Sequence, residues 1–179
     1  MRAFISAGHF DQLSTVGEEG AVAGGVREHD LAVAIVNEMA LRMLRMRPLI
    51  VPAVPLAAKI RWVNRWAEGG DVAIEVHINA AENESAHGVE TYYCDGSVRG
   101  IQLAEALQRY LVMTGRHDRG VKPDSESARH RLGWLRDTQP WAALVEAGFL
   151  TNPDERLWLT GRGAQQVGRT LAEALDSLA

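Results

Sequence analysis

Apolar residues recur along this chain at two spacings, which together predict alternating strands and helices. Short, nearly continuous apolar runs predict strands, whereas apolar residues at every third or fourth position predict helices with one buried face. The predicted strands are residues 3–7, 49–54, 71–80, 88–94 and 141–149. The predicted helices are residues 28–47, 55–70, 98–114 and 153–160, with a last helix that follows residue 163 and runs to the end of the chain.

Glycine and proline residues mark the boundaries between these elements. Pro48 ends the first predicted helix, and the glycines from Gly161 to Gly163 separate the last two helices. A glycine-rich segment after the first strand predicts a loop that runs to about residue 26. Residues 115–138 are polar and rich in Arg and His, which predicts a loop with at most short structured pieces.

The stretch DVAIEVHINA has the clearest alternation in the chain. The predicted apolar face of this strand carries Val72, Ile74, Val76 and Ile78, and the opposite face carries Asp71, Ala73, Glu75 and His77. Strands that alternate with helices favour a parallel sheet covered on both faces. We therefore predict an α/β fold in one domain, residues 1–179, with a twisted, mostly parallel central sheet and helices on both faces.

Composition narrows the possible partners. The chain has 19 Lys and Arg against 23 Asp and Glu, a net charge of -4. No block of like charge stands out, so binding to nucleic acid through its phosphates is not expected. The single cysteine, Cys94, excludes an internal disulfide and a cysteine metal cluster. A metal would therefore be held by His and carboxylate side chains.

The apolar runs are all shorter than the roughly 18 residues that a membrane span needs. The first residues, MRAFISAGHF, also lack an apolar segment of signal-peptide length. We therefore expect no membrane insertion and no signal peptide, in a chain synthesised in the cytoplasm.

Candidate chemistry is concentrated at the ends of the predicted elements. His9 and His77 lie at strand ends, Glu146 lies near the end of the last strand, and Glu28 begins a helix. Ligands of open α/β sheets gather at the carboxyl ends of the strands, so these side chains are expected to meet. Two histidines and one glutamate are an established zinc ligand set in hydrolases. His9, Glu28 and His77 are the candidate Zn2+ ligands.

Hydrolysis of an amide also requires a group that moves a proton to the leaving nitrogen. Glu146 ends an apolar strand, where partial burial would raise its pKa and suit it to this catalytic task. Each residue alone has a simpler interpretation: a loop histidine for His9, a helix-start acid for Glu28, a turn residue for His77 and an ion pair for Glu146. Their joint position at element ends favours a site.

Several segments in order resemble one known family, and together they cover nearly the whole chain. These are SAGHFDQ, REHDLA, VHINA, HGVETYY, RGVK and PWAALVEAGFLTNPDE, the last being the most specific. The sequence resembles the zinc-dependent N-acetylmuramoyl-L-alanine amidases of the amidase 3 type. The resemblance implies an α/β fold, zinc ligands at His9, Glu28 and His77, and a catalytic Glu146. It also implies cleavage of the amide between N-acetylmuramic acid and L-alanine in peptidoglycan.

The chain departs from the family pattern at three places. The usual Asp-Pro before the GH pair is replaced by Ser6 and Ala7, which we expect to change the loop geometry or the support of His9. The usual Arg in the helix of residues 55–70 is replaced by Lys59, and we expect this change to affect packing rather than chemistry. The usual Ser two positions before the second histidine is Glu75. This carboxylate either orients His77 or points to a solvated edge, and the sequence leaves both open.

Other side chains have both a binding and an ordinary interpretation. His87 either faces the cleft or is a solvated loop histidine. Trp134, with Arg131 and Arg136 nearby, either grips a glycan or peptide carboxylate or covers the edge of the core.

The leading hypothesis is a zinc amidase that hydrolyses the bacterial cell wall, such as a phage or prophage lysin or an enzyme exported by a non-classical route. A zinc peptidase or another amide hydrolase that acts on stem peptides or acyl amino acids is a second enzymatic hypothesis. A catalytically silent wall-binding module is a third, and the intact set of four residues argues against it. The oligomeric state is left open.

Overall fold

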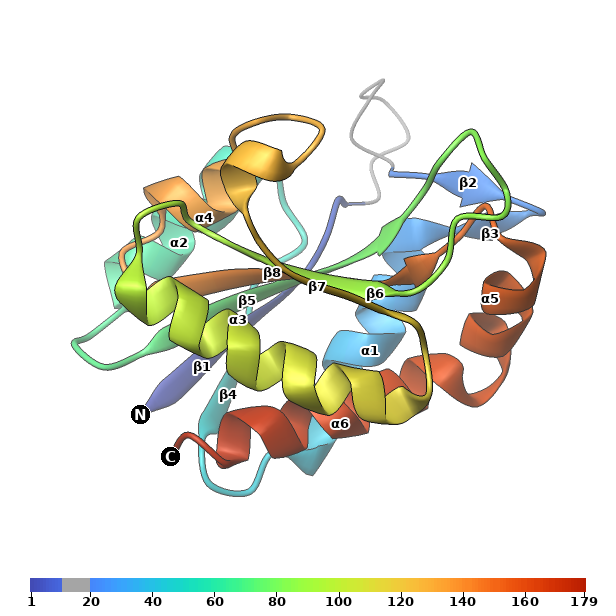
Figure 1. Ribbon diagram of the computed structural model, residues 1–179. Helices are drawn as coiled ribbons and strands as arrows, with labels where there is room; N and C mark the ends of the chain where they lie inside the picture. The colour runs from blue at the N-terminus through green and yellow to red at the C-terminus, as the bar shows by residue number, and fades with distance from the viewer. Residues whose placement is uncertain (11–19) are drawn as a thin grey trace.

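The computed structural model describes residues 1–10 and 20–179, so part of the predicted glycine-rich loop lies outside the described residues. A twisted sheet of six strands crosses the molecule in the order β4-β1-β5-β8-β6-β7 (Figure 1). Its strands are β1 (Arg2–Ala7), β4 (Arg47–Ile50), β5 (Val72–Asn79), β6 (Val89–Tyr93), β7 (Asp118–Pro123) and β8 (Trp141–Phe149). A small hairpin is formed by β2 (Val22–Ala23) and β3 (Val26–Arg27).

The sheet is mostly parallel, as predicted. β1 pairs in parallel with β4 and β5, β5 pairs in parallel with β8, and β6 pairs in parallel with β7. Only the pairing of β6 with β8 is antiparallel in this sheet. The predicted α/β class with a mostly parallel central sheet is confirmed.

Helices cover both faces of the sheet (Figure 1). They are α1 (Glu28–Arg42), α2 (Leu56–Trp66), α3 (Val98–Leu111), α4 (Gly133–Asp137), α5 (Pro153–Trp158) and α6 (Ala164–Asp176). Short helical turns are η1 (Val112–Thr114), η2 (Asp124–Glu126) and η3 (Leu159–Gly163). Gly161 has a non-helical backbone within η3, which agrees with the predicted break before the last helix.

The alternation along β5 divides the core in two. Val72, Ile74, Val76 and Ile78 are buried in the larger core, with the apolar faces of α1, α3 and α6. Ala73 belongs to the smaller core on the other face, with Val63 of α2 and Trp134 of α4. The predicted faces of this strand are confirmed, and Glu75 and His77 share the face of the smaller core.

The first helix is shorter than its apolar pattern predicts. α1 ends at Arg42, and β4 begins at Arg47 rather than at residue 49. Asp176, at the end of α6, accepts hydrogen bonds from the backbone N–H groups of Leu44, Arg45 and Met46, at 2.6, 3.0 and 3.0 Å. These contacts to a distant helix replace the hydrogen bonds of a further helical turn.

The polar segment of residues 115–138 is more structured than predicted. It contains β7, which pairs with β6 at the edge of the sheet, and α4. An edge strand buries few of its side chains, so its sequence lacks an apolar alternation. The prediction of a loop with only short pieces was therefore wrong for β7.

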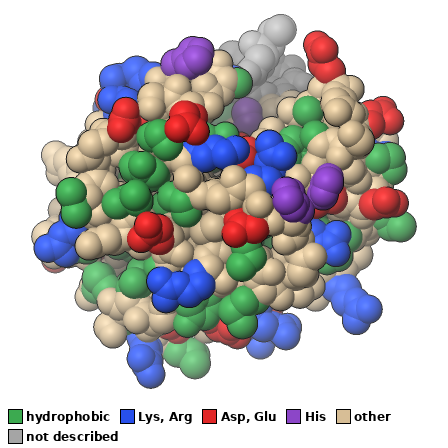
Figure 2. Space-filling model, viewed as in Figure 1, with side chains coloured by type: hydrophobic (Ala, Val, Ile, Leu, Met, Phe, Trp, Pro, Cys, Tyr) green, Lys and Arg blue, Asp and Glu red, His purple; other side chains and the backbone are tan. Residues whose placement is uncertain are grey.

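Charged side chains of both signs are interspersed over the face shown in Figure 2. Within the described residues, every helix is too short or too polar to cross a bilayer.

Candidate active site

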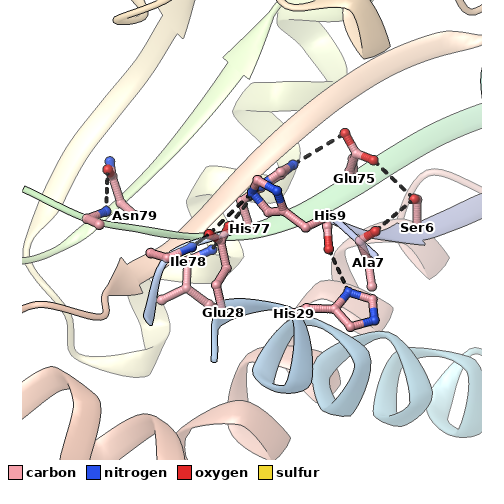
Figure 3. A network of polar contacts seen from close by, with 12 residues as sticks. Ser6, Ala7, His9, Glu28, His29, Glu75, His77, Ile78 and Asn79 are labelled. Carbon is pink, nitrogen blue, oxygen red and sulfur yellow. Dashed lines mark hydrogen bonds and ion pairs between the residues drawn. The ribbon is translucent and has the colours of Figure 1, made fainter. Parts of the chain in front are cut away.

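His9, Glu28 and His77 converge where β1, β5 and the first residue of α1 meet at one edge of the sheet (Figure 3). The edge opens into a cleft of about 800 Å³. Glu146 of β8 lines the same cleft as these three residues. The structure therefore brings together all four side chains that were predicted to meet at element ends.

Glu28 lies between the two imidazoles. Its Oε1 lies 2.9 Å from His77 Nδ1, and its Oε2 lies 3.3 Å from His9 Nε2. The backbone N–H groups of Ala21 and Ile78 also donate to this carboxylate, at 2.8 and 3.2 Å. Burial alone would raise the pKa of Glu28, but the hydrogen bonds with His77 and then His9 outweigh it and lower the pKa well below its ordinary value. Glu28 is thus a buried carboxylate anion, which favours the binding of a cation.

His9 is held in an unusual backbone conformation. Its φ is 57°, in the left-handed region that side chains other than glycine seldom adopt. The preceding Gly8 donates its N–H to the Val76 carbonyl at 2.7 Å, and a Cβ at Gly8 would overlap the His77 ring. His29 Nδ1 lies 2.9 Å from the Gly8 carbonyl oxygen. Close approach of the two imidazoles therefore requires glycine before His9.

His77 is held between two carboxylates. Its Nδ1 faces Glu28, and its Nε2 lies 3.3 Å from Glu75 Oε2. Burial alone would lower the pKa of His77, but the hydrogen bonds to Glu28 and then Glu75 outweigh it and raise the pKa well above its ordinary value. Glu75 is buried against His77 and does not point to a solvated edge.

Lys59 was expected to affect packing, but its side chain contacts Glu75, the carboxylate beside His77. Its buried ammonium lies 3.1 Å from Glu75 Oε1. Lys59 and His29 are neighbours of the site that the sequence pattern did not predict. The only signal for Lys59 was a charged residue in place of the usual arginine on a predicted helix.

Glu146 faces the cleft from the strand beside His77, with which it is in register. Its Oε2 has no hydrogen-bond partner among the described residues. The pKa of Glu146 is raised to about 8, mainly by burial. The nearby His77 lowers this pKa, whereas the carboxylates of Glu28, Glu90 and Glu75 raise it further. A carboxyl group with this pKa can exchange a proton near neutral pH.

The donor set fits a zinc ion. One ligand atom from each of His9, Glu28 and His77 lies within 4.8 Å of the others. Two imidazole nitrogens and one carboxylate oxygen match a zinc set that leaves a position for water. Glu146 provides a carboxyl group for proton transfer in the same cleft.

His87 and Trp134, for which the sequence left a binding role open, differ in their position relative to the cleft. His87 is exposed and does not line the cleft; its Nδ1 lies 2.9 Å from the Ser85 carbonyl oxygen. Trp134 lines the cleft, but it is only 1% exposed and packs in the smaller core.

The two nearby arginines differ from each other. Arg136 is bound to the buried carboxylate of Asp124 at 2.6 Å, which makes it part of the framework. Arg131 lines the cleft and also forms an exposed ion pair with Asp137 at 2.9 Å.

Comparison with known proteins agrees with this geometry. The N-acetylmuramoyl-L-alanine amidase LytC of Bacillus subtilis is 27% identical over an alignment of 161 residues, and the match covers 85% of this chain and 30% of LytC. The endolysin of Bacillus phage SPP1 is 28% identical over an alignment of 169 residues, and the match covers 85% of this chain and 56% of the endolysin. The chain thus spans about half or less of the length of these relatives.

The fold is that of a solved amidase. An N-acetylmuramoyl-L-alanine amidase from Clostridium difficile 630 superposes with a TM-score of 0.83 at 23% identity, over 98% of this chain and 95% of the other. The model of the family described as N-acetylmuramoyl-L-alanine amidase, Amidase_3, matches residues 4–177. The chain therefore belongs to the Amidase_3 family of N-acetylmuramoyl-L-alanine amidases.

Proposed function

We propose that this chain is a zinc-dependent amidase that hydrolyses the bond between N-acetylmuramic acid and L-alanine in bacterial peptidoglycan. The observation that carries the proposal is the convergence of His9, Glu28 and His77 in one cleft with the carboxyl group of Glu146. Membership of the amidase family supports the choice of bond.

His9, Glu28 and His77 would hold the metal. When bound, zinc supplies a Lewis acid that polarises a carbonyl group and lowers the pKa of water. Glu28 can bind the metal without first losing a proton, because its pKa is already well below the ordinary value. His77, by contrast, has a raised pKa, so its ring must release a proton when the nitrogen binds the metal.

Glu146 would move the proton. It accepts a proton from the water that attacks the carbonyl carbon, and it donates that proton to the nitrogen as the carbon–nitrogen bond breaks. An amide nitrogen leaves poorly as an anion, so this transfer is necessary for the products to separate. The raised pKa of Glu146, about 8, suits a group that must both accept and release a proton.

The rim of the cleft suits an anionic peptide. Arg129 and Arg131 line the same cleft as Glu28, Glu75 and Glu146. We infer that these guanidinium groups contact carboxylates of the stem peptide, while the sugar and L-alanine lie over the zinc ligands.

The similarity to a phage endolysin supports a role as a phage or prophage lysin. The cell wall would then be the place of action.

The test is digestion of purified peptidoglycan, with and without a chelator, followed by mass spectrometry. We expect new N-terminal L-alanine on intact stem peptides, no release after chelation and recovery when zinc is restored. Cleavage between amino acids of the stem would instead support the peptidase hypothesis. Binding to the wall without any cleavage would support the silent binding module.

A further inference from the structure

Lys59 is a buried cation that contacts the segment carrying His9. The side chain of Lys59, on α2, is only 3% exposed. Its ammonium donates to the carbonyl oxygens of Ala7 and His9, the latter at 3.1 Å, and lies 3.1 Å from Glu75. These carbonyls flank the turn in which His9 has its left-handed backbone. Lys59 thus binds the backbone at the point where the Asp-Pro pair usual in the family is missing.

The two oxygens of Glu75 have different partners. Oε1 accepts hydrogen bonds from Lys59 Nζ at 3.1 Å and from Ser6 Oγ at 3.2 Å. Oε2 lies 3.3 Å from His77 Nε2 (Figure 3). The carboxylate is therefore fixed on one side and directed at the imidazole on the other. With Nε2 occupied, His77 presents Nδ1 to Glu28.

The two charges depend on each other. A charge buried without a partner costs several kcal/mol, whereas a paired charge with its remaining hydrogen bonds satisfied is tolerated. Glu75 is 4% exposed and Lys59 2%, so neither ion would be stable here alone. Each of these buried charges therefore requires the other.

We propose that the buried Lys59–Glu75 pair positions both histidines of the metal centre: Glu75 holds Nε2–H of His77 so that Nδ1 faces the metal, and Lys59 holds the backbone on both sides of His9. Both residues line the cleft, and the role assigned to the pair is to act through these ligands. The inference rests on the proposed zinc site and assigns a function to two residues outside the ligand set.

A matched control lies at the opposite end of the same strands. Asp71 is also 4% exposed, and it binds Arg2 at 2.6 Å where β1 and β5 begin. This ion pair ties the same two elements together at the end remote from the cleft. Its loss tests the effect of a weakened sheet without a change at the metal ligands.

The main experiment measures zinc affinity by competition with a chromophoric chelator. The double variant Lys59→Met/Glu75→Leu replaces the pair with apolar side chains, which often preserves stability. We expect it to fold and to bind zinc about 10- to 100-fold more weakly, the range typical of lost contacts to a ligand. Asp71→Asn should lower the melting temperature and leave zinc affinity within about twofold. A double variant that binds zinc as tightly as the wild type would overturn the proposal.

Single variants keep the test valid if the double variant does not fold. Glu75→Gln retains the shape of Glu75. With its amide oxygen toward Lys59, however, the amide nitrogen faces Nε2–H of His77 and cannot accept from it. We expect Glu75→Gln to weaken zinc binding at least tenfold, and Lys59→Arg, which keeps the charge, to retain most of the affinity. Equal affinities in wild type and Glu75→Gln would contradict the role of Glu75.

A spectroscopic measurement separates this inference from the metal site itself. Nitrogen-15 NMR of the His77 ring should show a slowly exchanging Nε2–H proton in both metal-free and zinc-loaded wild type, and this signal should disappear in the double variant. Wild type that retained this proton but bound no zinc would overturn the proposed metal centre, while the contact with Glu75 would stand. Wild type that bound zinc without a protected Nε2–H would overturn the positioning role alone.

Discussion

At the scale of single residues, each proposed zinc ligand is held by neighbours that take no part in the reaction. Glu28 accepts two backbone N–H groups, His77 faces Glu75, and His9 follows a glycine that leaves room for the second imidazole. These contacts fix the directions of the donor atoms before a metal arrives. Pre-organisation of this kind favours metal binding because less conformational freedom is lost.

Glu146→Gln should separate catalysis from metal binding. The amide keeps the shape of Glu146 but cannot accept the proton of the attacking water, so we expect peptidoglycan hydrolysis to fall at least about 100-fold. Zinc content of the purified variant, measured by atomic emission, should remain equal to that of the wild type. A fully active variant would exclude Glu146 as the proton-transfer group.

The raised pKa of Glu146 predicts a dependence of stability on pH in protein treated with a chelator. The folded chain holds this proton up to a pKa of about 8, against 4.5 for the ordinary group. Because the folded state binds the proton more tightly, its stability should fall as pH rises between these two values. Urea unfolding of Glu146→Gln should therefore show a gain over the wild type of about 2–4 kcal/mol above pH 8, and almost none near pH 4.5.

The exposed Glu82 provides a control for this measurement. Glu82→Gln should change stability by less than about 0.5 kcal/mol at either pH. A difference between Glu146→Gln and wild type that does not vary with pH would contradict the predicted titration.

At the scale of elements, the site depends on where strands and helices end. β5 and β8 place His77 and Glu146 side by side in register, and α1 begins with Glu28. The segment between α1 and β4 is held by the Asp176 carboxylate at the end of α6. The boundary between α1 and β4 therefore depends on a residue that is 130 to 132 positions away in the sequence.

Asp176→Ala should weaken the connection between α1 and β4. Three backbone N–H groups lose their acceptor, so we expect a loss of about 1–3 kcal/mol in unfolding free energy. Hydrogen exchange should also become faster for the amides of Leu44, Arg45 and Met46. Glu173→Gln, at an exposed position of the same helix, should leave both measurements unchanged.

At the scale of the whole molecule, the proposed metal would join segments that are distant in sequence. His9 follows β1, Glu28 begins α1 and His77 belongs to β5. These segments already pack around the larger core, and a shared ion would add a further link between them. A ligand that binds only the folded state raises its stability in proportion to the logarithm of its concentration.

Zinc at about 100 times its Kd should stabilise the chain by about 2.7 kcal/mol, which corresponds to a rise of about 5–10 °C in Tm for this chain length. His77→Ala should abolish the shift, because it removes one ligand. His87→Ala, which changes an exposed histidine outside the cleft, should retain it. The measurement is thermal unfolding with and without zinc, and an unchanged shift in His77→Ala would remove His77 from the proposed ligand set.

Much of this architecture was predictable because local patterns carry the information. The alternation of Val72, Ile74, Val76 and Ile78 identified the buried face of β5, and the order of strands and helices predicted the parallel sheet. The placement of His9, Glu28, His77 and Glu146 at element ends followed from the same patterns. Their proximity is a consequence of strand direction, since parallel strands end at one edge.

The tertiary structure alone decided the contacts between residues that no local pattern connects. The sequence left the direction of the Glu75 side chain open. Lys59 lies 16 residues earlier in the chain, and only the packing of α2 against the sheet brings it to Glu75. The edge strand β7 and the early end of α1 were likewise set by β6 and α6. The physical reason is that apolar periodicity predicts which face of an element is buried. The partner of a buried charge depends instead on which other element packs against that face.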